Sequence, residues 1–234
     1  MEQGMAQRSP LTRERMKTPR AAAIAGILFS ILLATILVLL RISVQAASQE
    51  ARAWLAGDAD TVVLALNLVP FAGIAFLWFI GVVRDRLGAY EDRFFATVFL
   101  GSGLLFLAMF FAAAAVAGAT LIALEAAPRP MIESGAYIFG RAIIARIMNV
   151  YALKMAGVFM ISTATLGIRT RILPRWIALP GYALALLLLA SSHFVNWLGL
   201  AFPLWVFVLS AYILVENLRG PSAGTTANQM GEST

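Results

Sequence analysis

The chain has 234 residues, of which 61% are hydrophobic and 13% are charged, and its formal net charge is +6 at pH 7. Soluble domains carry about 25% charged residues, and here the apolar residues form long runs, so the composition excludes an ordinary soluble domain and indicates a membrane protein. The absence of cysteine and the single histidine exclude disulfides, thiol catalysis and His-cluster metal sites.

The N-terminal third is predicted to contain a tail and two membrane spans. Residues 1–20 are polar and basic and include two prolines, so we expect a cytoplasmic tail that contacts anionic lipid. Residues 21–41 form the first predicted span, because their apolar run exceeds the roughly 7–15 residues of a signal-peptide core. After a short outer loop, in which Asp58 or Asp60 can cap the next helix, residues 61–83 form the second span.

Two local features of the next segments carry further predictions. Asn67, Pro70 and Gly73 lie close together in the second span and predict a kink in its outer half. The third span covers residues 94–119, and its small residues at 108, 112, 115 and 119 favour close approach of a neighbouring helix.

The C-terminal half is predicted to contain three more spans. The fourth covers residues 143–167, preceded by a helical segment from Tyr137, and the fifth and sixth cover residues 176–192 and 197–215. The core of the protein is therefore a six-helix transmembrane domain over residues 21–216, and residues 217–234 form a disordered cytoplasmic tail.

Charge predicts the orientation of these spans. Of the 18 basic residues, 12 fall in the N-terminal tail, in the loop 84–93, at 169–175 or at Arg219, so the positive-inside rule places both termini in the cytoplasm. The same rule accounts for the net positive charge without a nucleic-acid partner. Sixteen arginines against two lysines, with abundant alanine, are typical of a GC-rich genome and favour a bacterial plasma membrane.

The fourth predicted span differs from the others because it carries Arg146, Asn149 and Lys154. A lysine at the centre of a membrane helix costs about 2.5–3.5 kcal/mol on insertion scales. On an ideal wheel the three side chains share one side of the helix, with Arg146 and Lys154 about 80° apart. Lys154 either snorkels or forms a structural pair, or it belongs to a site for an anion.

Depth along the helices predicts partners for Lys154. Asn67, Thr35 and Lys154 all lie roughly 9–16 Å below the outer end of their spans at 1.5 Å per residue, and Glu125 is placed to pair with Arg146 or Arg141. We predict a site open to the outside that is formed by Lys154, Arg146, Asn149 and Asn67 and suits a carboxylate, a phosphate or a lipid headgroup. The alternative is a buried polar network that sets helix register.

A rhomboid-like intramembrane protease is the catalytic alternative, since the chain has Ser102 in a Leu-Gly-Ser-Gly sequence and one histidine, His193. Ser102 lies roughly 12 Å from the inner end of its helix, whereas His193 lies at the opposite face of a core ~30 Å thick. The two side chains are too far apart to exchange a proton, so we expect no catalytic centre. We also expect no metal and no cofactor.

Residues 166–189, LGIRTRILPRWIALPGYALALLLL, resemble a helix–basic loop–Pro-Arg-Trp–helix segment of uncharacterised bacterial multi-pass membrane proteins. The resemblance implies no activity. Taken together, the sequence predicts an all-α, six-span plasma-membrane protein that binds or transports a small anionic or amphipathic solute. The alternative is a non-catalytic assembly or regulatory subunit that packs against a membrane partner or a second copy of the chain.

Overall fold

The computed structural model describes residues 18–46, 59–87, 93–170, 173–190 and 197–218, and every regular element in these ranges is a helix. The predicted tails at 1–17 and 219–234, together with Asp58 and His193, lie outside the described residues. In chain order the elements are α1 (Thr18–Ala46), α3 (Ala59–Leu87), α4 (Arg93–Ala126), α5 (Pro128–Glu133), α6 (Ala136–Arg146), the π-helix η2 (Ile147–Ala152), α7 (Leu153–Arg169), α8 (Arg175–Ala190), the 3-10 turn η3 (Leu198–Leu200) and α9 (Ala201–Leu218).

Five described helical segments are long and apolar enough to cross a membrane, so the protein is a multi-pass helical membrane protein. Each of the six predicted spans corresponds to a helix, but α8 has only 16 residues. At 1.5 Å per residue α8 is about 24 Å long, which is shorter than a hydrocarbon core of ~30 Å. The helix α3 continues through Pro70 without a break. Asp60 is the second residue of α3 and lies inside its first turn, so it is not the residue that precedes and caps the helix.

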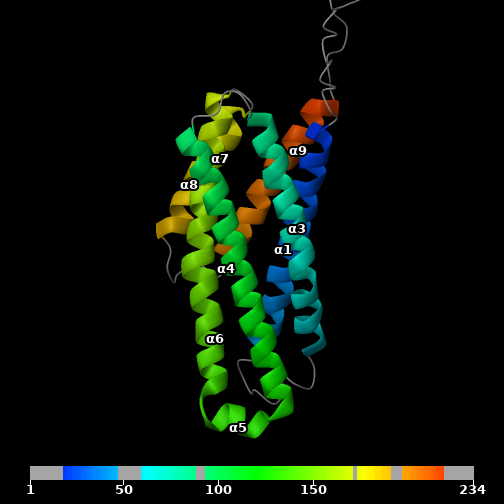
Figure 1. Cartoon of the computed structure of the whole chain (residues 1–234), viewed down its shortest axis with the longest axis vertical. Coiled ribbons are helices and arrows are strands. Elements are labelled where there is room, and N and C mark those ends of the chain that lie inside the picture. Colours follow the sequence, from blue (N-terminus) through cyan, green and yellow to red (C-terminus); the bar gives the residue numbers. More distant parts are fainter. Residues whose placement is uncertain (1–17, 47–58, 88–92, 171–172, 191–196, 219–234) are drawn as a thin grey trace, which may run out of the picture.

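The helices form two groups (Figure 1). In the first group α1 packs along α3 and α9, and in the second α7 packs along α4 and α8, whereas contacts between the groups are fewer. The short helix α5 joins α4 to α6 at one end of the bundle, here called the α5 end. The first turn of α1 and the last turn of α9 lie together at the opposite end (Figure 1).

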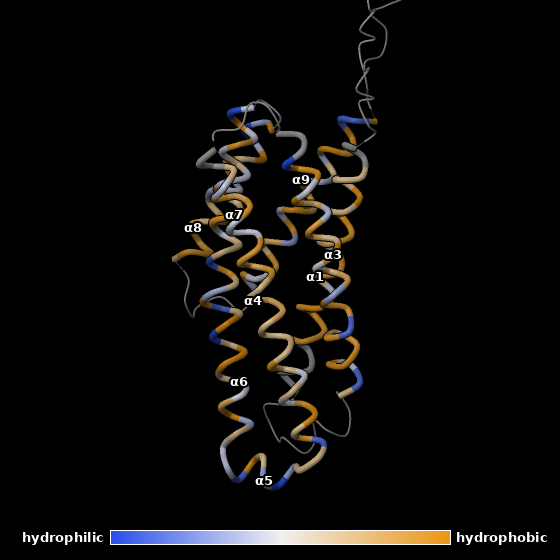
Figure 2. Tube along the Cα trace, in the orientation of Figure 1, coloured by the Kyte–Doolittle hydropathy of each residue, from blue (hydrophilic) through white to orange (hydrophobic). Residues whose placement is uncertain are grey.

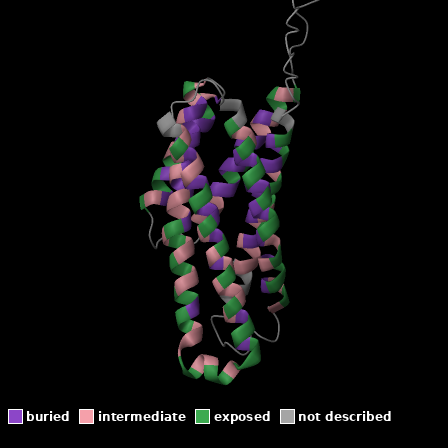
Figure 3. Cartoon of the chain, viewed as in Figure 1, coloured by how far each residue is buried: buried purple, intermediate pink, exposed green. Residues whose placement is uncertain are grey.

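Charged and apolar segments are arranged as a bilayer requires. Hydrophilic residues gather around α5 and at the opposite helix ends, and most of the chain between them is hydrophobic (Figure 2). Buried residues concentrate in the part of the bundle that contains α8 and α9, whereas α4 and α6 are mainly exposed toward the α5 end (Figure 3). The helices α8 and α9 are shorter than α1, α3 and α4, so they contribute to the core over only part of its length.

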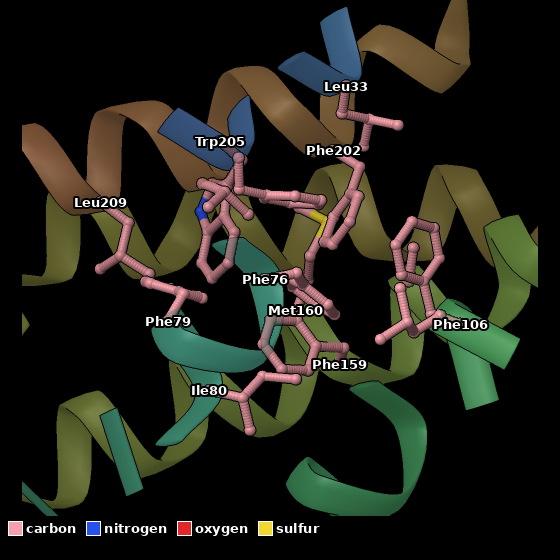
Figure 4. Packing of buried hydrophobic residues seen from close by; sticks show 14 of the residues in the cluster. Leu33, Phe76, Phe79, Ile80, Phe106, Phe159, Met160, Phe202, Trp205 and Leu209 are labelled. Carbon is pink, nitrogen blue, oxygen red and sulfur yellow. The ribbon is translucent and has the colours of Figure 1, made fainter. Parts of the chain in front are cut away.

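Phenylalanine side chains fill the centre of this core (Figure 4). The ring of Phe76 on α3 lies 4.4 Å from Phe29 on α1, 5.4 Å from Phe106 on α4, 5.3 Å from Phe159 on α7 and 6.1 Å from Phe202 on α9. All five side chains are at most 1% exposed. One aromatic cluster, here called the phenylalanine cluster, thus joins the two helix groups, and its mixture of tilted and edge-on rings is the arrangement that aromatic quadrupoles favour.

A tryptophan connects α9 to α8. The Trp205 indole of α9 donates a hydrogen bond of 3.2 Å from its Nε1 to the carbonyl oxygen of Ile177 on α8. Gly181 makes room for this ring, since a Cβ at that position would lie 2.6 Å from Trp205 Nε1. Gly181 is therefore a packing residue, because a larger side chain would displace the indole and break the bond.

We expect Phe76→Ala to destabilise the protein by about 3–5 kcal/mol, because it removes a buried ring and leaves a cavity at the junction of both helix groups. Phe71→Ala is the matched control on the same helix, since Phe71 is 61% exposed. Unfolding of both variants in phosphatidylcholine nanodiscs, followed by tryptophan fluorescence, measures the difference. Equal losses for the two variants would contradict the central role of Phe76.

Candidate functional site

The segment from α6 to α7 is one continuous rod whose middle is a π-helix. Its residues Ile147–Ala152 separate Arg146 from Lys154. A π-helical turn holds one more residue than an α-helical turn, and such segments occur frequently at functional sites. The sequence predicted a regular span at 143–167 and did not predict a π-helix within it.

The packing of this rod against α4 explains the π-helix. Buried and half-buried side chains recur every four residues along it, and α6, η2 and α7 all pack on α4. The residues in this row are Gly140, Ile144, Met148, Ala152 and Ala156. In an ideal α-helix of 3.6 residues per turn, each four-residue step rotates the row by about 40°, so the row would leave α4 after two or three steps. The wider turn removes this drift and keeps the row on α4.

The π-helix also changes how the charged residues are arranged. Because the π-helical turn holds one extra residue, the side chains that follow it are rotated about the helix axis by about 100° from their positions in an ideal α-helix. The angle between Arg146 and Lys154 therefore falls from about 80° to about 20°. Both cations lie along one line of the helix surface, with the amide of Asn149 between them in the chain.

Exposure shows which way this line faces. Arg146 and Asn149 are exposed and Lys154 is half-buried. The side chains of these three residues form no hydrogen bond or ion pair with any other described residue. We call Arg146, Asn149 and Lys154 the cationic face. Among the described residues, it lies on the surface of the bundle.

The last described turns of α8 lie close to Lys154. A Cβ at Gly157 would lie 3.1 Å from the carbonyl oxygen of Ala185 and 3.2 Å from Leu189 Cγ, so the last described turns of α8 pack beside Gly157. Lys154 is one turn nearer the α5 end, and the described part of α8 extends to Ala190.

The structure does not bring Asn67 to this face. Asn67 is exposed and lies on the same side of α3 as Phe71 and Trp78, which are 61% and 65% exposed, at spacings of four and eleven residues. Thr35 is also exposed, on the side of α1 that faces away from the buried Leu33 and Ile36. Hydropathy placed these residues at similar depths, but depth does not determine the direction in which a side chain points.

The predicted pairing of Glu125 with an arginine is likewise not formed among the described residues. Glu125 is exposed at the end of α4, and the guanidinium of Arg141 lies 5.7 Å from the centre of the Tyr137 ring, a cation–π contact. Arg141 is therefore held within α6, whereas Arg146 has no such contact with a described residue.

Ser102 has a structural role in its own helix. The hydroxyl is buried and donates to the carbonyl oxygens of Val98 and Phe99, at 2.6 Å and 3.1 Å. A hydroxyl engaged in this way is typical of serine within a membrane helix. The nearby Gly103 lies against Phe159 and Ile80, so this sequence serves helix packing.

No family model, no curated protein and no solved structure matches the chain. The described residues also contain no cluster of histidine, aspartate and glutamate that could hold a metal ion.

We expect deletion of Val150 to be tolerated, at a cost of about 2 kcal/mol or less. Removing one residue from a π-helix restores the α-helical turn and leaves the faces of α6 and α7 in place. Deletion of Val158 is the matched control, since it rotates the rest of α7 by about 100° and turns its buried row away from α4. Thermal unfolding in nanodiscs compares the two. Equal damage from both deletions would contradict this account of the π-helix.

Proposed function

We propose that this six-span plasma-membrane protein, with both termini cytoplasmic, binds the anionic group of a small or amphipathic solute on its cationic face. The observation that carries the proposal is the π-helix, which places Arg146 and Lys154 along one line of the helix surface with no described partner for either. Charges near hydrocarbon are costly and usually serve a function or a structural pair. The absence of a described pair favours a ligand.

The three side chains suit a phosphate or a carboxylate. The arginine guanidinium presents a planar fork of donors that matches two oxygens of such a group, and the lysine ammonium adds a compact point charge. The amide of Asn149 supplies two further donors. All three are donors toward an anion, so the site discriminates against cations by its charge.

The filled axis of the bundle favours binding over conduction. The phenylalanine cluster joins both helix groups at the centre, and its rings are almost completely buried. A polar solute that passed along this axis would have to displace these rings. The cationic face lies on the outside of the bundle, so a solute reaches it from the membrane or its surface.

We expect phosphatidate in phosphatidylcholine nanodiscs to raise the melting temperature of the full-length protein. Arg146→Gln or Lys154→Gln should reduce the affinity about tenfold or more, since a hydrogen bond to a charged group contributes about 1.5–3 kcal/mol. Arg84→Gln is the control, because Arg84 is an exposed arginine at the other end of the bundle. If Lys154→Met only stabilises the protein and leaves the shift unchanged, Lys154 is structural and the proposal fails.

A second candidate function is that of an assembly subunit, and the small residues of α4 favour it. Ala108, Ala115 and Ala119 are exposed and Ala112 is half-buried, so this row does not pack fully against the chain's own helices. Rows of small residues at this spacing let another helix approach closely.

We expect Ala115→Leu to weaken self-association if this row contacts a second copy. Leu28→Ala on α1 is the control, because Leu28 is exposed on a different helix. Sedimentation in detergent measures the oligomeric state. A monomeric wild-type protein would remove the homo-oligomer version of this alternative.

A further inference from the structure

The charged residues of α7 lie closer together than the two surfaces of a bilayer. Between Lys154 and Arg169 the chain carries no charge, and this part of α7 measures roughly 22 Å at 1.5 Å per residue. A hydrocarbon core is ~30 Å thick, so a core that begins at Arg169 extends roughly 8 Å beyond Lys154. The apolar length of α7 is therefore shorter than an undeformed bilayer requires.

The segment that leads into α9 gives the same limit toward the α5 end. A Cβ at Gly199 in η3 would lie 4.0 Å from Cδ2 of Leu153, and Leu153 directly precedes Lys154. Trp197 begins this segment and is exposed. Exposed tryptophans are typical of the interface between membrane and water. On this side of the bundle, hydrocarbon is thus limited by both α7 and the start of the α9 segment at one level.

A matching border lies at the end of these helices opposite α5. The ring of Trp176, near the start of α8, lies 6.0 Å edge-on from the ring of Tyr212, near the end of α9. Arg169 at the end of α7 and Arg175 at the start of α8 are both exposed. Aromatic and basic side chains together are the usual anchors of helices at an interface.

The helix α3, which lies on the opposite side of the bundle from α8 (Figure 1), is longer between its charges. Asp60 and Arg84 are both exposed, and they are roughly 36 Å apart along the helix. The residues between them carry no charge. A long apolar segment fits a bilayer by tilting, whereas a short one requires the bilayer to become thinner. The two sides therefore make different demands on the surrounding lipid.

From these lengths we infer that the bilayer is about 8 Å thinner beside α7 and α8 than beside α3, and that the α7–α8 side is fitted to phospholipids with short acyl chains. Thinning brings the polar layer to Lys154 and Trp197, so the ammonium does not remain in hydrocarbon. The inference goes beyond the proposed function, because it concerns the lipid around the helices and requires no bound solute.

Spin labels measure this difference directly. The chain has no cysteine, so a single introduced cysteine is the only labelled site. Leu186 on α8 and Ile74 on α3 are exposed, and each lies roughly 15–17 Å from the end of its helix opposite α5. We compare Leu186→Cys with Ile74→Cys in the full-length protein in dioleoylphosphatidylcholine nanodiscs. The accessibility of each label to oxygen and to a water-soluble nickel chelate reports its depth.

We expect the label at Leu186 to lie about 8 Å closer to water than the label at Ile74. Adding Lys154→Leu should move the Leu186 label deeper, because the next charge along the rod is then Arg146. Lys154→Arg keeps the charge and should leave the depth unchanged. Equal depths at the two sites would overturn the inference, since Lys154 would then reach water by extending its own side chain. An unchanged depth in Lys154→Leu would overturn it as well.

Melting temperatures test the fit to short chains. We expect the wild-type protein to melt at a higher temperature in dimyristoleoylphosphatidylcholine than in dierucoylphosphatidylcholine, whose chains are longer. Lys154→Leu should reduce this difference, whereas Asn67→Leu should preserve it, because Asn67 is an exposed polar residue of α3. A wild-type protein without this preference, or an equal reduction in both variants, would overturn the fit of the α7–α8 side to short chains.

Discussion

The packing of Phe76 against four other phenylalanines is the contact on which the rest of the bundle depends. These rings come from α1, α3, α4, α7 and α9, so a single cluster joins helices that are otherwise divided between two groups. In a membrane, hydrophobic burial does not drive helices together, because lipid is as apolar as a leucine side chain. Shape complementarity and ring geometry must do so instead, and large rigid rings provide both.

This cluster limits where a solute can interact with the protein. Because it occupies the centre, the described charged side chains of the spans are left outside the buried core, and only small hydroxyl side chains such as Ser102 are buried. Arg146 and Asn149 are exposed and Lys154 is half-buried, so these side chains lie toward the outside of the described bundle. The predicted recess was open to the outside and included Asn67; among the described residues, Arg146, Asn149 and Lys154 instead lie together on the surface of the bundle without Asn67.

The π-helix satisfies two requirements at once. It keeps a row of five small and apolar side chains on α4 through four steps of four residues, and it brings two cations into line on the opposite part of the surface. The sequence does contain a signal for it, since Gly140, Ile144, Met148, Ala152 and Ala156 repeat every four residues. The signal is weak because almost every residue around this row is also apolar, and only contact with α4 shows that the row is the buried one.

The sequence by itself determined the fold class and the approximate bounds of the helices. Apolar runs such as residues 21–41 and 61–83 form α-helices in lipid, because every backbone hydrogen bond must be made within the segment. It also identified Arg146, Asn149 and Lys154 as the unusual residues of the spans, since a charge in an apolar run is visible without coordinates. The tertiary structure alone decided the rotation of each helix about its axis. It turned Asn67 and Thr35 outward, aligned Arg146 with Lys154 and placed Phe76 at the centre, because hydropathy reports the depth of a residue in the membrane, and only packing determines the direction of its side chain.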